Sequence, residues 1–192
     1  MQVVIFNGPP RSGKDTVSRM LVEHMDSRVT TPILEESLSM PMRHSMFGLL
    51  GLSYSDSLYE SLKPTTIPGL GVTGRQHMID ISEKFLKPVY GQDVMARLFA
   101  DRVHGFPGVV MVRDGGFQIE VEYLVKLFGP ANVYVVRVHR EGCDFTNDSR
   151  EWVSHPKSSH NMDLPNSGDL DDLRVEAGRI YGRLVNQLGW VL

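Results

Sequence analysis

A glycine-rich segment near the start of the chain has the residue types and spacing that bind phosphate. It fits the pattern GxxxxGK and reads Gly8-Pro9-Pro10-Arg11-Ser12-Gly13-Lys14. In this pattern successive backbone N–H groups surround a phosphate, and the lysine contacts the terminal phosphates of a nucleotide. A lysine at a helix N-terminus is unfavourable unless an anion is present. We therefore expect Lys14 to bind the β- and γ-phosphates of ATP.

The residues after the lysine depart from the usual pattern. A Ser or Thr hydroxyl normally meets Mg²⁺ there, whereas this chain has Asp15 followed by Thr16. Either Asp15 approaches the metal, directly or through water, or Thr16 takes a related role. Asp114 ends an apolar strand, where it would orient magnesium-bound water or the acceptor, or form a turn before Gly115 and Gly116. Asp15, Thr16 and Asp114 are thus the candidate metal contacts.

Cationic side chains in the middle of the chain are candidates for binding a second phosphate. Phosphoryl transfer requires donor and acceptor in line and neutralised charge on the transferring group. Arg43, Lys63 and Arg75 are expected to contact the acceptor, because guanidinium and ammonium groups bind phosphate oxygens. The alternative for each is a solvated charge on a helix face.

A polar stretch over 140–160 lacks apolar periodicity and is predicted to be a loop or lid. Arg137, Arg140 and Arg150 flank it or lie in it, so closure would bring guanidinium groups onto the nucleotide. Arg140 is the preferred catalytic cation, and Arg150 is assigned to substrate binding. A charge that only keeps the loop soluble is the alternative for each.

Apolar runs and helical periodicity alternate along the chain. The predicted strands are 2–7, 33–40, 109–112 and 133–138, and the predicted helices are 14–25, 74–86, 93–103, 118–128 and 169–188. Strands that alternate with helices indicate an α/β fold with a mostly parallel sheet, and the almost wholly apolar run at 2–7 is expected in its middle. We predict one domain over 1–192, in which 31–105 forms a helical acceptor-side region.

The phosphate-binding segment also carries a resemblance to a known family. Arg11-Ser12-Gly13-Lys14-Asp15-Thr16 resembles the RSGKDT form found in deoxynucleoside monophosphate kinases of bacteriophage type. Shorter resemblances follow in the same order along nearly the whole chain, at Ser39–Arg43, Lys63, Gly71–Arg75, Gly91–Val94, Asp114–Glu120 and Asn166–Gly168. The family pattern has an arginine where this chain has Gly116.

This resemblance implies a three-layer P-loop kinase fold with a lid, and transfer of phosphate from ATP to a deoxynucleoside monophosphate. The implied nucleotide-binding residues are Gly8, Arg11, Ser12, Gly13, Lys14, Asp15, Thr16 and Asn166. Lys14, Asp114 and Arg140 are the expected catalytic residues. The alternatives are a P-loop kinase of another small metabolite, and a nucleotide-binding module without kinase activity, which the glycine at 116 favours.

The composition excludes several other function classes. The 192 residues carry a formal net charge of −3, so general affinity for polymeric nucleic acid is not expected. Cys143 is the single cysteine, which excludes an internal disulfide and fits a reducing compartment. No apolar run approaches the length that spans a bilayer, so a cytoplasmic protein without a membrane partner is expected. The oligomeric state is left open, with a homodimer as one option.

Overall fold

The computed structural model describes residues 1–26, 31–146 and 148–188. Its elements are β1 (Gln2–Asn7), α1 (Lys14–Asp26), β2 (Ile33–Glu36), α2 (Met40–Leu49), α3 (Asp56–Leu62), α4 (Gly74–Asp80), the π-helix η1 (Ile81–Leu86), α5 (Lys87–Tyr90), α6 (Val94–Arg102), β3 (Val109–Val112), α7 (Gln118–Phe128), β4 (Val133–His139), the 3₁₀-helix η2 (Ser158–His160), β5 (Asn161–Pro165) and α8 (Leu170–Leu188).

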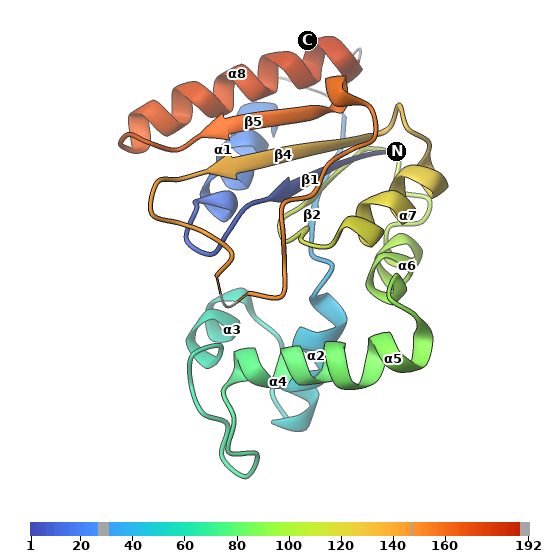
Figure 1. The fold of residues 1–192 in the computed structure, drawn as a ribbon, viewed down its shortest axis with the longest axis vertical. Helices are drawn as coiled ribbons and strands as arrows, with labels where there is room; N and C mark the ends of the chain where they lie inside the picture. The colour runs from blue at the N-terminus through green and yellow to red at the C-terminus, as the bar shows by residue number, and fades with distance from the viewer. Residues whose placement is uncertain (27–30, 147, 189–192) are drawn as a thin grey trace.

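The strands form one parallel sheet in the order β2-β3-β1-β4-β5 (Figure 1). The first strand lies in the middle, because Val4 pairs with Met111 of β3 on one side and with Tyr134 of β4 on the other. A strand in this position is covered on both faces, which explains its nearly continuous apolar sequence. The predicted central position of this strand and the α/β fold class are confirmed.

Helices cover both faces of the sheet. Alternate residues of β1 point to opposite faces, so Val4 and Phe6 pack with α1 and α8, whereas Val3 and Ile5 pack with α6 and α7. The helix after β1 therefore lies on one face and the helix after β3 on the other. The carboxyl ends of β1 and β3 border the crevice in which open α/β sheets bind ligands.

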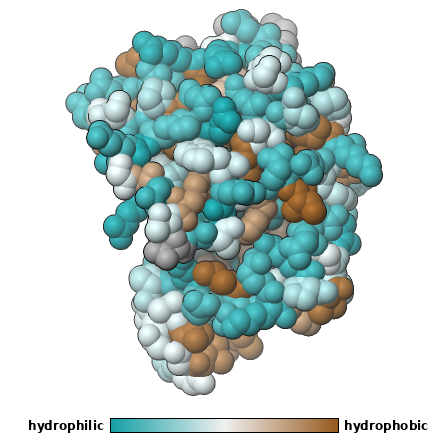
Figure 2. Space-filling view, in the orientation of Figure 1, coloured by the Kyte–Doolittle hydropathy of each residue, from teal (hydrophilic) through white to brown (hydrophobic). Residues whose placement is uncertain are grey.

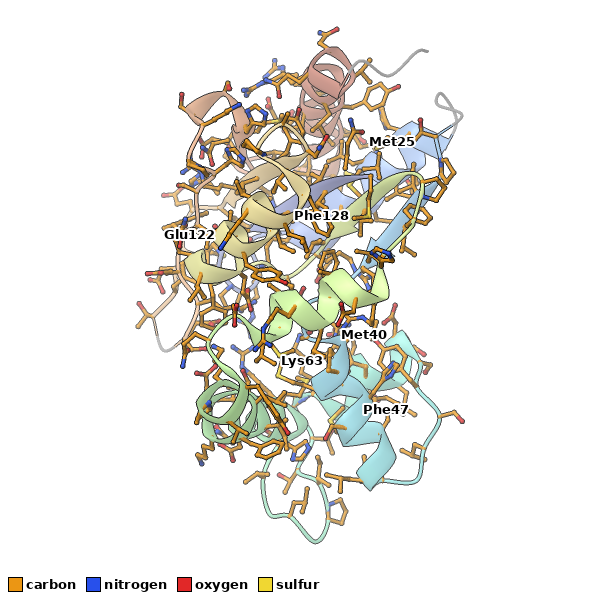
Figure 3. The ribbon with its side chains drawn as sticks, turned by 90° about the vertical axis from the view of Figure 1, so that its right-hand side faces the viewer. Met25, Met40, Phe47, Lys63, Glu122 and Phe128 are labelled. Atoms are coloured by element: carbon orange, nitrogen blue, oxygen red, sulfur yellow. The ribbon has the colours of Figure 1, made fainter. Side chains whose placement is uncertain are left out.

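A helical part lies beyond the carboxyl edge of the sheet (Figure 1). It has a small core of its own, built from α2, α3, α4 and the connections between them, with Met46, Phe47, Tyr59, Ile67 and Met78 buried. Figure 3 shows Phe47 and Lys63 in this part, well separated from Met25 and Phe128 of the sheet layers. Met46 and Phe47 are thus core residues.

Two predicted boundaries need correction, and one strand was missed. The strand expected over 33–40 ends at Glu36, because Ser37 and Ser39 turn the chain toward Asp114 and Pro41 opens α2. The helix expected over 74–86 continues as η1 and α5 to Tyr90 and ends at Gly91, whose φ is 100°. The strand β5 was not predicted; its inward residues Met162 and Leu164 are only two alternating apolar positions.

The described helices include none whose length and apolar character would let it cross a bilayer. On the face shown in Figure 2, hydrophobic residues are interspersed with hydrophilic ones.

A buried asparagine joins the end of β1 to two other segments at the carboxyl edge. Asn7 is fully buried, and its amide donates to the Gly115 carbonyl at 3.0 Å and the Glu151 carbonyl at 2.9 Å. Its side-chain oxygen accepts from the Val153 N–H at 3.2 Å. The Asn7 side chain thus holds the carboxyl ends of β1 and β3 and the segment at Glu151–Val153 together.

Asn7→Ala is expected to lower the free energy of unfolding by about 2–4 kcal/mol, because two buried backbone groups and one partly buried backbone group lose their partner. Urea unfolding followed by circular dichroism measures this loss. Gln187→Ala is the control, since its amide makes one exposed bond to the Ser159 carbonyl and should change stability by about 0.5 kcal/mol or less. Equal losses in the two variants would refute a special role for Asn7.

Candidate functional site: a phosphate-binding loop facing a cationic pocket

The loop after β1 turns tightly through three residues with positive φ, two of which are glycines. Gly8, Arg11 and Gly13 have φ values of 155°, 65° and 97°. A Cβ at Gly8 would lie 2.6 Å from the Val138 carbonyl oxygen, so the glycine also permits close approach to β4. The loop leads directly into α1, whose first residue is Lys14. Backbone N–H groups and a helix N-terminus therefore meet at one point, as anion binding requires.

Asn166 supports this loop from the side of β5. Its side-chain amide donates to the Ser12 carbonyl at 2.8 Å, and its backbone N–H donates to the His139 carbonyl at 2.7 Å. A Cβ on Gly13 would lie 2.5 Å from the Asn166 amide nitrogen, so the two residues pack as closely as glycine allows. Asn166 is 7% exposed, and both of these hydrogen bonds go to the protein backbone.

Lys14 is held as a buried cation next to the loop. Its side chain donates from Nζ to the Pro9 carbonyl at 2.9 Å, and the residue is only 8% exposed. Burial, together with the positive charge of Arg150, lowers the pKa of Lys14 to about 8, against the opposing effect of Asp15, Asp148 and Asp114. The ammonium thus lacks the compensation that a phosphate would give.

Asp114, at the end of β3, joins the sheet to the helical part. Its carboxylate accepts from the Ser37 hydroxyl at 2.5 Å, the Leu38 N–H at 2.8 Å and the Ser39 N–H at 3.1 Å. Burial alone would raise the pKa of Asp114, but the charge of Arg43 and these hydrogen bonds hold it below its usual value. Asp114 is therefore an ionised anchor for the turn that begins α2.

Arg43, on α2, is the cation that Asp114 faces. Its guanidinium lies 3.8 Å from an Asp114 oxygen, donates to the Ser39 hydroxyl at 2.9 Å and stacks 4.2 Å from the centroid of Tyr59. Burial alone would lower the pKa of Arg43, but the charge of Asp114 together with Tyr59 and Tyr54 raises it above its usual value. Its position is thus fixed by contacts on several sides.

Lys63 and Arg75 reach the same region from neighbouring elements. Lys63 follows α3 with its side chain 34% exposed, and its backbone carbonyl accepts from the Arg75 N–H at 2.8 Å. Arg75 stands in the first turn of α4 and forms an ion pair with Asp148 at 3.1 Å. Arg150 binds the same carboxylate at 2.6 Å. Residues from the helical part and from the predicted lid are thereby connected.

The predicted lid divides into two portions. Residues 140–146 and 148–150 form turns and irregular chain without helix or strand, whereas Glu151 and Val153 are bonded to Gly116 and Asn7 at the sheet edge. Arg140 is exposed, and its guanidinium donates to the Arg11 carbonyl at 3.5 Å. Arg140 therefore lies beside the phosphate loop but outside the cavity, whereas Arg150 lines the cavity.

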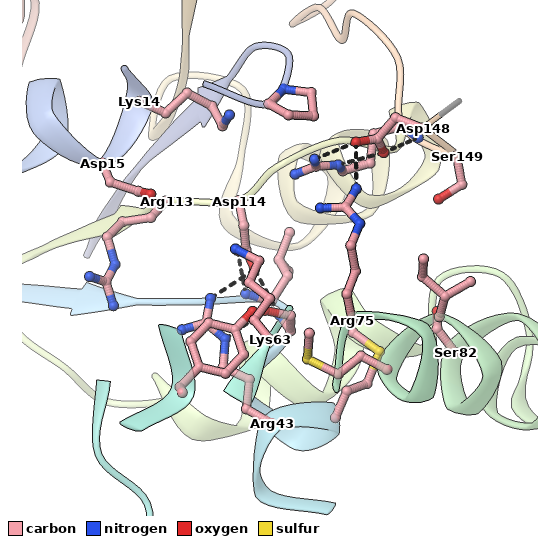
Figure 4. Close-up of a pocket in the computed structure, with 18 of the residues that line it drawn as sticks. Lys14, Asp15, Arg43, Lys63, Arg75, Ser82, Arg113, Asp114, Asp148 and Ser149 are labelled. Atoms are coloured by element: carbon pink, nitrogen blue, oxygen red, sulfur yellow. Dashed lines mark hydrogen bonds and ion pairs between the residues drawn. The ribbon is translucent and has the colours of Figure 1, made fainter. Parts of the chain in front are cut away.

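A cavity of about 680 Å³ lies between the sheet edge and the helical part. Figure 4 shows Lys14 and Asp15 on one side of it and Arg43, Lys63 and Arg75 opposite. The predicted residues that line it are Arg11, Lys14, Asp15, Arg43, Lys63, Arg75, Asp114 and Arg150. Gly8, Ser12, Gly13, Thr16, Arg140 and Asn166 lie outside this lining.

Several lining residues were not found by sequence reasoning. Arg113 precedes Asp114 and forms ion pairs with Glu35 at 3.7 Å and Asp56 at 3.6 Å. Phe117 and Glu120 line the cavity from the start of α7. Burial and the charge of Asp114 raise the pKa of Glu120 to about 8, so its carboxyl is mainly neutral at pH 7. The one available signal was the position of all three beside the carboxyl end of β3.

Comparison with known proteins supports the fold. No protein-family model and no curated protein sequence matches the chain. Among solved structures, a gluconokinase from Sinorhizobium meliloti 1021 aligns with a TM-score of 0.51 and 12% identity, over 98% of this chain and 95% of that one. Kti12 from Chaetomium thermophilum, solved in complex with ADP-AlF3, aligns with a TM-score of 0.52 and 13% identity, over 94% and 98%.

The chain therefore has the fold of P-loop kinases, with a five-stranded parallel sheet flanked by helices. The predicted fold class is confirmed. At these identities the likeness extends to the fold, and the chemistry of the site has to be argued from its own residues.

Lys14→Met is expected to raise the free energy of unfolding at pH 7 by up to about 3 kcal/mol, because it removes a buried charge whose pKa lies at about 8 instead of 10.5. Between these two pH values the unfolded wild type binds more protons than the folded one, so wild-type stability rises with pH. The advantage of the variant should therefore shrink from pH 8 to pH 10.5.

Chemical unfolding at a series of pH values measures this difference. Lys126→Met is the control, because Lys126 is an exposed lysine on α7 and its removal should give no such gain. A Lys14→Met protein that is less stable than wild type at pH 7 would contradict the interpretation that the buried charge of Lys14 destabilises the fold.

Proposed function

We propose that the protein transfers the γ-phosphate of ATP to a small molecule that itself carries a phosphate, with a deoxynucleoside monophosphate as the acceptor. The observation that carries this proposal is the shared cavity: Lys14 of the phosphate loop and the cations Arg43, Lys63 and Arg75 line one space. A donor loop alone would serve ATP binding. A second group of cations on the facing wall is what a charged acceptor requires.

The donor half of the proposal rests on the loop and its neighbours. Backbone N–H groups between Gly8 and Gly13 would surround the β-phosphate, and Lys14 would contact the β- and γ-phosphates. Arg140, beside the Arg11 carbonyl, is close enough to the loop to approach the nucleotide when the adjoining chain moves. Asn166 would keep the loop in shape through the Ser12 carbonyl.

Magnesium would accompany the nucleotide, and the residues present fit this role. Mg²⁺ in such sites is usually held by one or two carboxylates together with phosphates and water. Asp15 is exposed and lines the cavity, whereas the oxygens of Asp114 already accept three hydrogen bonds. Of the two alternatives after Lys14, the carboxylate is therefore favoured over Thr16. Bound Mg²⁺ would neutralise charge on the phosphates during transfer.

The acceptor half rests on cations whose positions are already fixed. Arg43 is held by Asp114, Ser39 and Tyr59, so its guanidinium would meet an acceptor without reorganising. Asp114 would act as a positioning residue, because it joins Arg43 and the turn at Ser37–Ser39 to the end of β3. Lys63 and Arg75 would complete the acceptor side.

The direct test is ADP release from Mg-ATP in the presence of a panel of ribo- and deoxyribonucleoside monophosphates, with an acceptor-free control. One or a few deoxynucleotides are expected to raise the rate sharply. Lys14→Met should fold and lose at least about 100-fold in rate, because Lys14 would stabilise charge on the transferring group. Arg174→Ala is the control, since Arg174 is exposed on α8, outside the cavity lining.

A panel in which no monophosphate raises ADP release would overturn the proposed acceptor class. A Lys14→Met protein that kept most of the wild-type rate would overturn the assignment of the donor loop.

A further inference from the structure

One carboxylate in the cavity wall holds two arginines that come from different parts of the chain. Asp148 accepts from Arg75 at 3.1 Å and from the Arg150 side chain at 2.9 and 2.6 Å, and it also accepts from the Arg150 N–H at 3.1 Å. The Asp148 side chain is 4% exposed. Figure 4 shows Arg75 extended toward Asp148. Two guanidinium groups thus converge on a single oxyanion.

The charges in this group do not balance. Arg75 and Arg150 carry two positive charges, and among the described residues Asp148 is the one carboxylate that forms an ion pair with them. By contrast, Arg43 faces both Asp114 and Asp56, and Arg113 faces both Glu35 and Asp56. Burial alone would raise the pKa of Asp148, but hydrogen bonds and charge from Arg150, with Arg75, lower it to about 2. The site therefore favours an anion strongly and would accept one with more charge than a carboxylate.

Gly116 gives Arg150 its place in the cavity. A Cβ at Gly116 would lie 2.5 Å from both Cγ and Cδ of Arg150 and 2.8 Å from its Cβ. The φ of Gly116 lies outside the left-handed region, so the backbone conformation does not require glycine there. The Glu151 N–H also donates to the Gly116 carbonyl at 3.0 Å. The absent side chain therefore makes room for an arginine delivered from position 150.

The position of this arginine relates it to both halves of the cavity. Arg150 is close enough to Lys14 for its charge to lower the pKa of that lysine, and it shares Asp148 with Arg75 of the helical part. An oxyanion bound by Arg75 and Arg150 would thus lie on the acceptor side and face the phosphate loop. This is the position from which an acceptor phosphate must approach the γ-phosphate.

We propose that Arg75 and Arg150 form one binding site for a phosphate monoester, and that Asp148 binds these arginines until the phosphate displaces it. The inference deepens the proposed function, because it assigns the acceptor's phosphate to these two guanidinium groups. A phosphate monoester presents more oxygens and more negative charge than the carboxylate it replaces. Asp148 lies in irregular chain, so its departure requires no helix or strand to break.

An internal anion of this kind lowers the apparent affinity for an external one. An external phosphate binds only to the fraction of molecules in which Asp148 has left the two arginines. Removal of the carboxylate charge should therefore tighten phosphate binding, although Asp148 lines the cavity and contacts both binding residues. A residue that merely oriented the arginines would give the opposite result when replaced.

The test is calorimetric titration of inorganic phosphate into protein saturated with Mg-ADP, so that the phosphate loop is already filled. Asp148→Asn should bind phosphate about tenfold more tightly than wild type. Arg75→Ala and Arg150→Ala should each bind it at least about tenfold more weakly. Glu141→Gln is the matched control, because it removes the same charge from an exposed position of the same loop and should leave the affinity unchanged.

A further variant tests whether Gly116 makes room for the Arg150 side chain. Gly116→Ala should weaken phosphate binding in the wild-type background, because the added methyl group displaces the Arg150 side chain. In an Arg150→Gly background, which also lacks the Cβ that would lie 2.8 Å from the added methyl group, the same substitution should have no further effect. Circular dichroism confirms that each variant is folded before it is titrated.

Unchanged or weaker phosphate binding by Asp148→Asn would overturn the inference. Equal effects of Gly116→Ala in both backgrounds would overturn the role of Gly116. Failure of the proposed function gives a different pattern: no nucleoside monophosphate would raise ADP release, while Asp148→Asn still bound inorganic phosphate more tightly. That pattern would retain the oxyanion site and transfer it to another phosphate-bearing molecule.

Discussion

A lysine ammonium is buried at the carboxyl edge of the sheet, and no carboxylate among the described residues forms an ion pair with it; the other features of the site are arranged around this constraint. Lys14 donates to the Pro9 carbonyl, and its pKa is lowered by burial and by Arg150. In most folded proteins such a cation is either paired with an anion or exposed to water. An anionic ligand would supply the opposite charge, and the loop from Gly8 to Gly13, which turns through positive φ angles, would add backbone donors at the same point.

The second requirement of the site is that the helical part be held at a fixed distance from this lysine. Asp114 meets that requirement, because its carboxylate at the end of β3 binds the turn that starts α2 and faces Arg43. Asn7 does the same for the other wall, since it ties the end of β1 to Gly115 and to the chain at Glu151 and Val153. Both anchors lie at the carboxyl ends of neighbouring strands, so the sheet determines the width of the cavity.

Much of this architecture could be predicted from local sequence patterns. Strong short-range signals mark the apolar runs at Gln2–Asn7 and Val109–Val112, the loop between β1 and α1, and the helix at Gln118–Phe128. The structure has these elements at the predicted residues. The strand β5 carries a weak signal, because two alternating apolar residues do not distinguish a strand from a loop. Its place in the sheet depends on pairing with β4, which local sequence does not encode.

The site was predictable in part for the same reason. The loop residues and Lys14 form one contiguous motif, whereas the relation of Gly116 to Arg150 joins positions 34 residues apart. At the level of sequence, Gly116 was only the loss of an arginine from a family pattern. The three-dimensional contact gives it a physical meaning, since the space left by one side chain is filled by another. Arg113 escaped notice because its partners Glu35 and Asp56 lie far away in the sequence.

The central claim is that a donor site and an acceptor site face each other across one cavity. Its most direct test is the affinity of a bisubstrate compound, adenosine joined to a deoxynucleoside through five phosphates, compared with ATP and with the deoxynucleoside monophosphate alone. If both sites are filled at once, the compound with the preferred base should bind about 100-fold more tightly than ATP. Affinity no greater than that of ATP, for all four common bases, would contradict the account.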